Sequence, residues 1–212
     1  VLMVRSFLAE PFRIPSDSMM PTLFDGDFIL VNKYAYGLRV PVTNAKVIPV
    51  GQPARGDVVV FRYPGMGPND PTKGSDYIKR VIGLPGDEVT YRGRTLYVNG
   101  MQVATLPDGS YSGTTRSKDY VNYTRVTEKL PELDHEILLG PPPGFAGGPE
   151  GSWRVSEGHF LVMGDNRSNS LDGRVWGLVP EANLVGKAFV IWMNWDFKDG
   201  GVDFGRLGTV IK

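Results

Sequence analysis

The fold class is decided by residues 77–100, which read YIKRVIGLPGDEVTYRGRTLYVNG. Apolar and β-branched residues in the pattern of β-strands form three short runs here: Tyr77–Ile82, Val89–Tyr91 and Thr95–Val98. Turn sequences separate or follow these runs: Pro85-Gly86-Asp87, Arg92-Gly93 and Asn99-Gly100. The last two lie where tight hairpin turns belong. This stretch therefore predicts successive antiparallel strands.

The same pattern extends in both directions along the chain. Further strand-like runs are Phe28–Val31, Val58–Tyr63, Phe160–Met163 and Ala188–Phe197. Two more turn sequences, Asp25-Gly26-Asp27 and Arg55-Gly56-Asp57, each come directly before a run. No long stretch has helical periodicity, and only Pro180–Leu184 predicts a short helical turn. The predicted fold class is mostly β, with antiparallel sheets and little helix.

Composition excludes several classes of protein. The 212 residues contain 23 Lys and Arg against 23 Asp and Glu, so the formal net charge is zero and nothing favours binding of nucleic acid. The absence of cysteine rules out a disulfide scaffold, a cysteine-ligated zinc site and a thiol nucleophile. Hydrophobic residues make up 41% of the chain, which is enough for a folded core.

The middle of the chain differs from its two ends. Between about Leu106 and Trp153, Ser, Thr, Gly and Pro dominate, and the segment 141–148 looks like a surface loop. Because most strand signals lie before and after this part, we predict a discontinuous catalytic β domain of residues 1–94 and 158–212. An inserted, loop-rich β cap domain would comprise residues 95–157. The apolar stretch Val1–Phe12 is too short to span a bilayer.

Several common catalytic signatures are absent from the sequence. There is no phosphate-binding glycine loop, no Gly-x-Ser-x-Gly elbow and no Ser-x-x-Lys motif. The two histidines, His135 and His159, are interpreted as structural. The loop 165–172 is rich in oxygen atoms, but Arg167 occupies a position where a calcium loop needs Asp or Asn. No metal and no cofactor are therefore predicted.

Two segments remain as candidates for chemistry. Residues 13–23 carry two serines, Ser16 and Ser18, between prolines that stiffen the turn. In Tyr77–Ile82, alternation places Lys79 on the same face as Tyr77. If that face is buried, the pKa of the amine falls, and holding it neutral at pH 7 requires about 4.6 kcal/mol, which burial can supply. The alternatives are a turn-capping serine and a lysine whose head reaches water.

Three segments resemble the conserved boxes of bacterial type I signal peptidases. They are Ile14–Leu23, Tyr77–Asp87 and Gly164–Pro180, and they occur in the order found in that family. Phe28–Gly37 and Arg55–Pro64 are similar to its intervening strands, so the resemblance covers roughly two thirds of the chain. Asp17 departs from the pattern, since the family often has glycine or another small residue there.

The resemblance implies a serine endopeptidase that removes signal peptides by means of a Ser/Lys dyad. Ser18 would be the nucleophile and neutral Lys79 the general base. The Ser170 hydroxyl would orient the amine. The Ser16 hydroxyl and the backbone N–H of Ser18 would form the oxyanion hole.

It also implies supporting and substrate-binding residues. Residues expected to hold the site through ion pairs are Arg80, Asp165, Asp172 and Arg174. Residues expected to line or approach shallow pockets for the small side chains before the cut are Ile14, Pro15, Met19, Leu23, Ile29, Val31, Tyr77 and Ile78. Each of these has the alternative interpretation of ordinary core packing.

The partners follow from the same resemblance. The substrate would be the signal peptide of a translocated preprotein, cut after an Ala-x-Ala type of sequence. The natural protein would continue upstream into membrane helices of the bacterial inner (plasma) membrane, with its catalytic part on the periplasmic side. Trp192, Trp195 and Phe197 are the candidates for contact with the lipid surface, with core packing on a strand as the alternative. The chain is expected to act as a monomer.

Two other interpretations stay open at this point. A self-cleaving repressor-type protease uses a related Ser/Lys pair, but it would need an N-terminal DNA-binding domain, which is not recognisable here. A non-catalytic β-rich binding module would be expected to have lost Ser18 or Lys79, and both are present.

Overall fold

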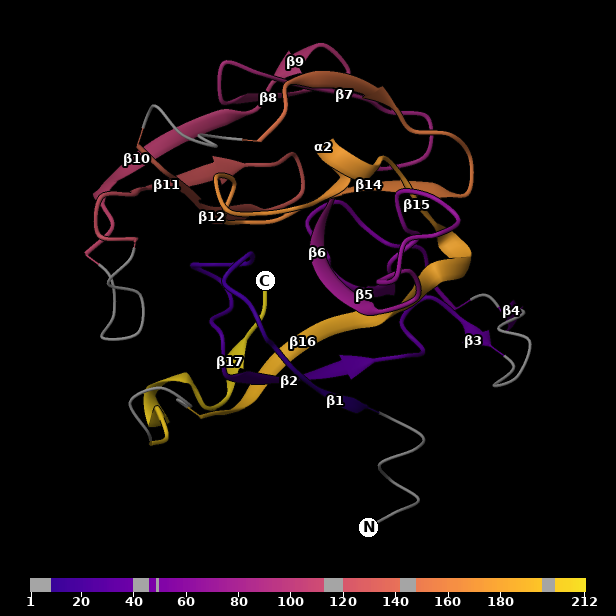
Figure 1. Cartoon of the computed structure of the whole chain (residues 1–212), viewed down its shortest axis with the longest axis horizontal. Coiled ribbons are helices and arrows are strands. Elements are labelled where there is room, and N and C mark those ends of the chain that lie inside the picture. Colours follow the sequence, from indigo (N-terminus) through magenta and orange to yellow (C-terminus); the bar gives the residue numbers. More distant parts are fainter. Residues whose placement is uncertain (1–8, 40–45, 49, 113–119, 142–147, 196–200) are drawn as a thin grey trace.

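Antiparallel strands dominate the computed structural model, which describes residues 9–39, 46–48, 50–112, 120–141, 148–195 and 201–212 (Figure 1). The strands are β1 Glu10–Arg13, β2 Asp27–Asn32, β3 Leu38–Arg39, β4 Lys46–Ile48, β5 Val58–Arg62, β6 Asp76–Gly83, β7 Glu88–Arg92, β8 Thr95–Val98, β9 Met101–Gln102, β10 Ala104–Ser110, β11 Thr124–Lys129, β12 Asp134–Leu139, β13 Gly151–Arg154, β14 His159–Met163, β15 Val179–Pro180, β16 Leu184–Asn194 and β17 Thr209–Val210. The helical elements are single turns: α2 Gly173–Trp176 and the 3₁₀ helices η2 Glu181–Asn183 and η3 Phe204–Arg206. The predicted fold class, mostly β with little helix, is confirmed.

The largest sheet contains the strands from both ends of the chain. Its strand order is β1-β2-β16-β5-β6-β14-β15, and β17 pairs with β16 beside this path. The sheet curls strongly around β5 and β6 near the middle of the molecule (Figure 1). In the β5–β6 pair, Val59 lies opposite Lys79, so the candidate lysine is in a central strand with a neighbour on each side. Its side chain lies on a covered face of the sheet, since Lys79 is only 4% exposed.

Two of the other sheets lie at the end of the molecule opposite β1, β2 and β17 (Figure 1). One has the order β10-β11-β12 and another the order β13-β7-β8-β9, while β3 and β4 form a separate pair. Hydrogen bonds join β7 to β8 and β13, so a strand from the predicted catalytic part pairs with strands of the predicted cap. The division into residues 1–94 with 158–212 and residues 95–157 stays a prediction.

A repeated Gly-Asp turn begins three of the predicted strands. Glycines at 26, 56 and 86 have φ of 88°, 93° and 89°, a left-handed conformation that glycine adopts without a Cβ clash. In each turn the following aspartate accepts a hydrogen bond from the backbone N–H three residues earlier: Phe24 to Asp27 at 2.8 Å, Ala54 to Asp57 at 3.0 Å and Leu84 to Asp87 at 2.6 Å. The sequence-based turn predictions at these positions are confirmed, because both turn residues have the role that the motif requires.

Other predictions differ from the structure in detail. The β7–β8 turn is centred on Gly93 and Arg94, both with positive φ, one residue later than predicted. β16 begins at Leu184 and not at Ala188, because the strand passes through Gly186 with a register shift. A Cβ at Gly186 would overlap the carbonyl oxygen of Asn32, so the glycine permits close strand approach inside the sheet.

Two sequence predictions fall partly outside the described residues. Of the apolar stretch Val1–Phe12, only the part from residue 9 is described, and Glu10–Phe12 belongs to β1. Most of the predicted surface loop 141–148 is likewise outside the description, as is Phe197. Among the described residues, no helix combines the length and the apolar character needed to cross a bilayer.

The core beneath the candidate site is a cluster of buried apolar side chains from the largest sheet, the loop between β1 and β2, and the end of the chain after β17. It contains Ile14, Met19, Leu23, Ile29, Val31, Val58, Val60, Ile78, Ala188, Ile191 and Ile211. A separate aromatic cluster, with Phe61, Tyr63, Tyr77 and Trp176 in contact, lies by β5, β6 and α2. Each cluster includes a residue of β6. Ile78 belongs to the core cluster, and its neighbour Tyr77 belongs to the aromatic cluster.

Candidate active site

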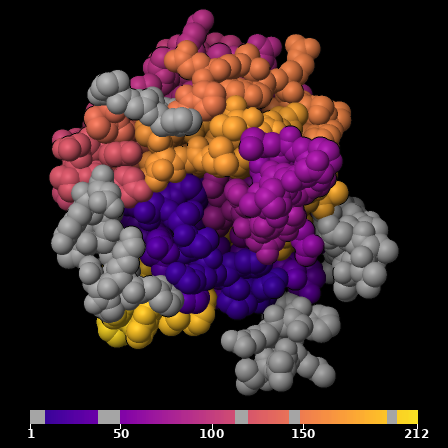
Figure 2. All heavy atoms as spheres, in the orientation of Figure 1, coloured from indigo at the N-terminus to yellow at the C-terminus, as the bar shows by residue number. Residues whose placement is uncertain are grey.

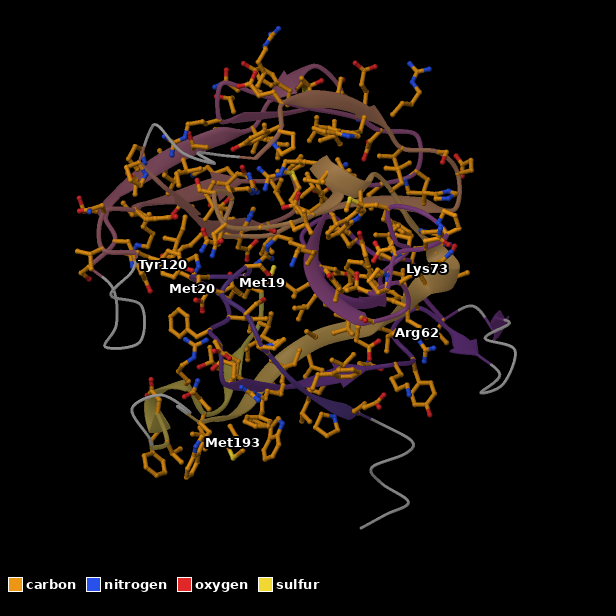
Figure 3. All side chains as sticks on the ribbon, viewed as in Figure 1. Met19, Met20, Arg62, Lys73, Tyr120 and Met193 are labelled. Carbon is orange, nitrogen blue, oxygen red and sulfur yellow. The ribbon has the colours of Figure 1, made fainter. Side chains whose placement is uncertain are left out.

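Ser18 lies in the loop between β1 and β2, and that loop is held by backbone contacts. Ile14 and Gly26 close its base, with the Ile14 N–H donating to the carbonyl of Asp27 at 2.8 Å. Met19 is fully buried and fixes the loop to the core (Figure 3). The N–H of Asn166 donates to the Ser18 carbonyl at 3.1 Å from the opposite side. The serine is therefore presented by a rigid loop.

Lys79 reaches Ser18 from β6. Its Nζ donates to Ser18 Oγ at 2.7 Å and to the carbonyl of Ile78 at 2.9 Å. The residue is only 4% exposed. This separation lies within the range required of a general base and the hydroxyl that it activates. Two residues that are 61 positions apart in the sequence are thus brought into hydrogen-bond contact.

Burial lowers the pKa of Lys79 from its ordinary value of 10.5 to about 8. The cause is loss of hydration, which disfavours the ammonium form. The carboxylates of Asp172 and Asp165 act in the opposite direction and raise this pKa, while the nearby Arg174 lowers it. With a pKa of about 8, roughly a tenth of the amine is neutral at pH 7, so a fraction able to accept a proton is present near neutrality.

Asp165 and Arg80 form a buried two-pronged ion pair behind the lysine. Arg80 Nε donates to Asp165 Oδ1 at 2.8 Å, and Arg80 Nη2 donates to Oδ2 at 2.7 Å. The Thr22 hydroxyl donates to the same carboxylate at 2.5 Å. Because Thr22 belongs to the serine loop and Arg80 follows Lys79, this single carboxylate links both parts of the site.

Asp172 and Arg174 form a second buried ion pair. Arg174 Nε and Nη2 donate to the two Asp172 oxygens, each at 2.8 Å. The Asp172 carboxylate also accepts the N–H of Gly164 at 2.9 Å and that of Arg174, and so caps α2. The ion pairs expected among these four residues are therefore formed, and both carboxylates have lowered pKa values although burial opposes ionisation.

A third buried pair was not recognised from the sequence. Arg167 donates from both terminal nitrogens to the carboxylate of Glu128, each at 2.6 Å. His135 lies against it, with Nε2 at 3.4 Å from Glu128 and 3.8 Å from Asp165. Burial lowers the pKa of His135 to about 4, so its ring is neutral near pH 7. No sequence signal marks Glu128, which lies in the compositionally variable middle of the chain.

The hydroxyls of Ser16 and Ser170 have different surroundings. The Ser16 hydroxyl lies 3.4 Å from Ser18 Oγ, so it borders the atom that would react. The Ser170 hydroxyl is buried but forms no hydrogen bond with the described residues, Lys79 included. A Cβ at Gly164 would overlap this hydroxyl and would lie 2.5 Å from the Ser18 carbonyl oxygen. Gly164 is therefore required for the close approach of the two serine segments.

The residues expected to line substrate pockets divide into separate groups. Six of them pack in the core cluster described above: Ile14, Met19, Leu23, Ile29, Val31 and Ile78. Pro15 is exposed, and Tyr77 belongs to the aromatic cluster. Most of the expected lining residues thus belong to the core cluster, whereas Tyr77 belongs to the aromatic cluster.

The unusual Asp17 has a specific partner. Its carboxylate accepts a hydrogen bond from the Tyr120 hydroxyl at 3.2 Å, and that hydroxyl accepts one from Asn169 at 2.6 Å. Tyr120 and Met20 are labelled on the same side of the molecule in Figure 3. The residue before Ser18 is thereby connected with the residue before Ser170.

Comparison with known proteins gives a consistent result. A family model described as signal peptidase, peptidase S26, matches residues 1–195. Signal peptidase I of Pseudomonas aeruginosa is 48% identical over 223 residues, an alignment that covers 99% of this chain and 74% of the relative. Signal peptidase I of Pseudomonas fluorescens is 49% identical over 206 residues, covering 92% and 68%. A crystal structure of a signal peptidase I from Enterococcus faecalis is 28% identical, with a TM-score of 0.38, covering 65% of this chain and 97% of that one.

The buried lysine amine held against a serine hydroxyl is an arrangement suited to peptide-bond cleavage without histidine. The chain belongs to peptidase family S26, the signal peptidases, and is a serine endopeptidase that removes signal peptides.

Proposed function

We propose that Ser18 is the nucleophile and Lys79 the general base of signal-peptide cleavage. The observation that carries this proposal is the 2.7 Å contact between Lys79 Nζ and Ser18 Oγ, together with burial that lowers the pKa of the amine to about 8. An ordinary lysine, charged at neutral pH, has no lone pair for a proton. Burial thus provides the neutral amine that the reaction needs.

In the reactive form, the Ser18 hydroxyl donates to the neutral Lys79 amine. Ser18 Oγ attacks the scissile carbonyl carbon as its proton passes to Nζ, and the resulting ammonium then donates that proton to the leaving amine. The C–N bond breaks, and an ester joins the signal peptide to Ser18. A water molecule, deprotonated by the same amine, hydrolyses the ester and restores both side chains.

The developing negative charge on the carbonyl oxygen would be stabilised by the Ser16 hydroxyl and the backbone N–H of Ser18. The 3.4 Å separation of the two serine hydroxyl oxygens supports this role for Ser16. The Arg80–Asp165 and Arg174–Asp172 pairs act indirectly. Each arginine neutralises a carboxylate that would otherwise stabilise the charged form of Lys79.

We assign the signal-peptide side of the substrate to the apolar core cluster. An extended peptide alternates its side chains, so the first and third residues before the cut face the same way. Ile14, Met19 and Ile78 are 2%, 0% and 8% exposed, so little of their surface is available to a substrate. We therefore expect only small side chains to be accepted there, in keeping with an Ala-x-Ala requirement.

Membrane contact is proposed from an exposed apolar surface on β16, η3 and β17. Trp192 is 39% exposed, Trp195 42% and Phe204 78%. Tryptophan and phenylalanine at a surface are suited to the interface between lipid headgroups and water. We place the protein, as a monomer, on the periplasmic side of the bacterial inner membrane. Co-sedimentation with vesicles that is lost in a Trp192→Ser, Phe204→Ser variant would support this position.

The test is cleavage of a preprotein whose signal ends in Ala-x-Ala, in detergent, with the cut site determined by mass spectrometry. The unmodified chain is expected to cut after the second alanine. Ser18→Ala and Lys79→Ala are expected to be inactive but folded. Ser110→Ala and Lys33→Ala, at exposed positions outside the site, serve as matched controls and are expected to be active. Near-full activity of Lys79→Ala would contradict the dyad.

A further inference from the structure

Tyr120, which lies just before β11, binds an acidic side chain next to the nucleophile. Its hydroxyl donates to the Asp17 carboxylate at 3.2 Å and accepts a hydrogen bond from Asn169 Nδ2 at 2.6 Å. A hydroxyl carries one proton, so the bond from the amide leaves that proton for the carboxylate. Burial, followed by the charge of Asp17, raises the pKa of the Tyr120 hydroxyl. The hydroxyl therefore remains a donor at neutral pH.

Packing fixes the Tyr120 ring against the serine loop, the segment between β1 and β2. The ring packs on a buried cluster to which this loop contributes Met20 and Phe24. It also meets the ring of Tyr123 edge-on, with the centroids 5.0 Å apart. In Figure 2, the indigo atoms of the N-terminal segment lie directly against the rose atoms of the segment that contains β11 and β12. The hydroxyl is thus held in one place beside Asp17.

The contact with Tyr120 adds little to the support of the loop backbone. At 3.2 Å it is longer than the length of about 2.7–2.8 Å that is usual for a hydroxyl donor. The loop has other supports, because Asn166 donates to the carbonyls of Asp17 and Ser18, each at 3.1 Å. Met19 is fully buried in the core cluster. What Tyr120 controls is therefore the carboxylate of Asp17 and not the backbone.

The peptide unit between Asp17 and Ser18 supplies an N–H to the proposed oxyanion hole. Its carbonyl accepts from Asn166 Nδ2, and the carbonyl and N–H of a trans peptide point in opposite directions. The Ser18 N–H therefore points away from Asn166. The Asp17 side chain is attached to the same peptide unit, and aspartate side chains readily accept from nearby backbone N–H groups. Without the Tyr120 hydroxyl, the carboxylate is free to reach this N–H.

A free carboxylate at this place would slow cleavage in two ways. It would compete with the substrate carbonyl oxygen for the Ser18 N–H, and its charge would repel the oxyanion that forms in the transition state. Both effects are strongest in the transition state, when the carbonyl oxygen becomes charged. An acidic residue directly before Ser18 thus has to be held aside, and the Tyr120 hydroxyl is the group that binds it.

We propose that Tyr120 is a positioning residue that holds the Asp17 carboxylate away from the oxyanion hole. The inference rests on the proposed function, because it needs the Ser18 N–H to bind the carbonyl oxygen. It adds to the active site a residue from the middle of the chain, which acts on the reaction only through Asp17.

The test is steady-state cleavage of the Ala-x-Ala preprotein by the parent and three variants. Tyr120→Phe removes only the hydroxyl, and it is expected to lower kcat about tenfold while KM stays within about twofold of the parent value. Asp17→Ala leaves no carboxylate to hold, so its kcat should stay within about threefold of the parent. The double variant should match Asp17→Ala, because removing the carboxylate restores the activity that is lost with the hydroxyl.

The matched control is Tyr97→Phe. Tyr97 is half-buried like Tyr120, and it lies in β8 outside the site. This variant is expected to have the kcat of the parent. Urea unfolding of each variant shows whether it is folded. The double variant separates a loss of fold from a released charge, since a protein that needs the Tyr120 hydroxyl to fold would stay slow after Asp17→Ala.

The inference is overturned if Tyr120→Phe has the kcat of the parent, if Asp17→Ala is as slow as Tyr120→Phe, or if the double variant is as slow as Tyr120→Phe. The last two results would mean that the contact braces the loop and does not hold a charge aside. Ser18→Ala and Lys79→Ala in the same assay keep the proposed function separate. If the parent cleaves the preprotein and these two variants do not, the dyad stands whatever happens at Tyr120.

Discussion

Replacing Lys79 by methionine is expected to abolish cleavage and, at pH 7, to stabilise the fold. Burial lowers the pKa of Lys79 from 10.5 to about 8. At 1.36 kcal/mol per pKa unit, the charged lysine destabilises the folded state by about 3 kcal/mol at pH 7. Methionine has a similar length and no charge. The variant loses the hydrogen bonds from Lys79 to Ser18 and Ile78, which costs about 1–2 kcal/mol. The free energy of unfolding of the variant should therefore exceed that of the parent by about 1–2 kcal/mol.

The pH dependence of this stability difference shows whether the lowered pKa of Lys79 is its cause. The pKa is lower in the folded state than in the unfolded state, so the penalty is complete below pH 8 and disappears as the pH rises towards 10.5. Two-state titration with these values gives a penalty of about 3 kcal/mol at pH 7 and about 1 kcal/mol at pH 9.5. The advantage of Lys79→Met over the parent should therefore shrink by about 2 kcal/mol between these pH values.

Urea unfolding monitored by tryptophan fluorescence at pH 7 and pH 9.5 measures this difference. The titration of groups common to both proteins cancels in the stability difference between them. Packing changes that do not depend on pH cancel when the differences at the two pH values are compared. Lys33→Met, at an exposed position paired with Glu10, controls for the loss of one lysine. The reasoning is refuted if the difference between Lys79→Met and the parent is the same at both pH values.

Four further outcomes are expected. Between pH 7 and pH 9, kcat/KM should rise about tenfold on a limb centred near pH 8, because the neutral fraction of Lys79 rises with pH; a limb centred near 6.5 would contradict lysine as the base. Ser16→Ala should lower kcat by about 10²–10³ with little change in KM, measured by steady-state kinetics, and an unchanged kcat would remove Ser16 from the oxyanion hole. Asp165→Asn should lower the free energy of unfolding by about 3–5 kcal/mol, since it leaves the guanidinium of Arg80 buried without its carboxylate; a loss below 1 kcal/mol in urea would count against this pair. Gly164→Ala should lower kcat/KM by about 10²-fold by displacing the serine loop, and a fully active variant would show that the loop adapts.

Local sequence patterns predicted those elements whose own residues favour the observed conformation. The runs Val58–Tyr63 and Tyr77–Ile82 alternate or are β-branched, and they became β5 and β6. The Gly-Asp turns were visible because glycine and aspartate each serve a local purpose. By contrast, β10 is exposed along its whole length and has Pro107 and Gly109 within it. Its strand conformation comes from pairing with β11, which no local pattern reveals.

The site residues that lie in the three segments resembling the signal peptidase family could be predicted from the sequence. Ser18 and Lys79 were singled out by a stiff loop and an alternating strand, and the family resemblance joined them. The Glu128–Arg167 pair escaped prediction because its two residues are 39 positions apart and neither lies in a pattern typical of buried charge. The predicted contact of Ser170 with Lys79 is absent from the hydrogen bonds of the described residues, since the position of a hydroxyl depends on packing around Gly164 that the sequence does not reveal.

Asp165 lies late in the sequence, and this position affects when the active site can form during synthesis. The ribosome makes Ser18, Thr22, Lys79 and Arg80 early, but it adds Asp165 and the Asn166 N–H that holds the Ser18 carbonyl much later. A nascent chain therefore carries the reactive hydroxyl and amine without the groups that align them. Because these groups come late in the sequence, the aligned site can form only after most of the described chain has been made.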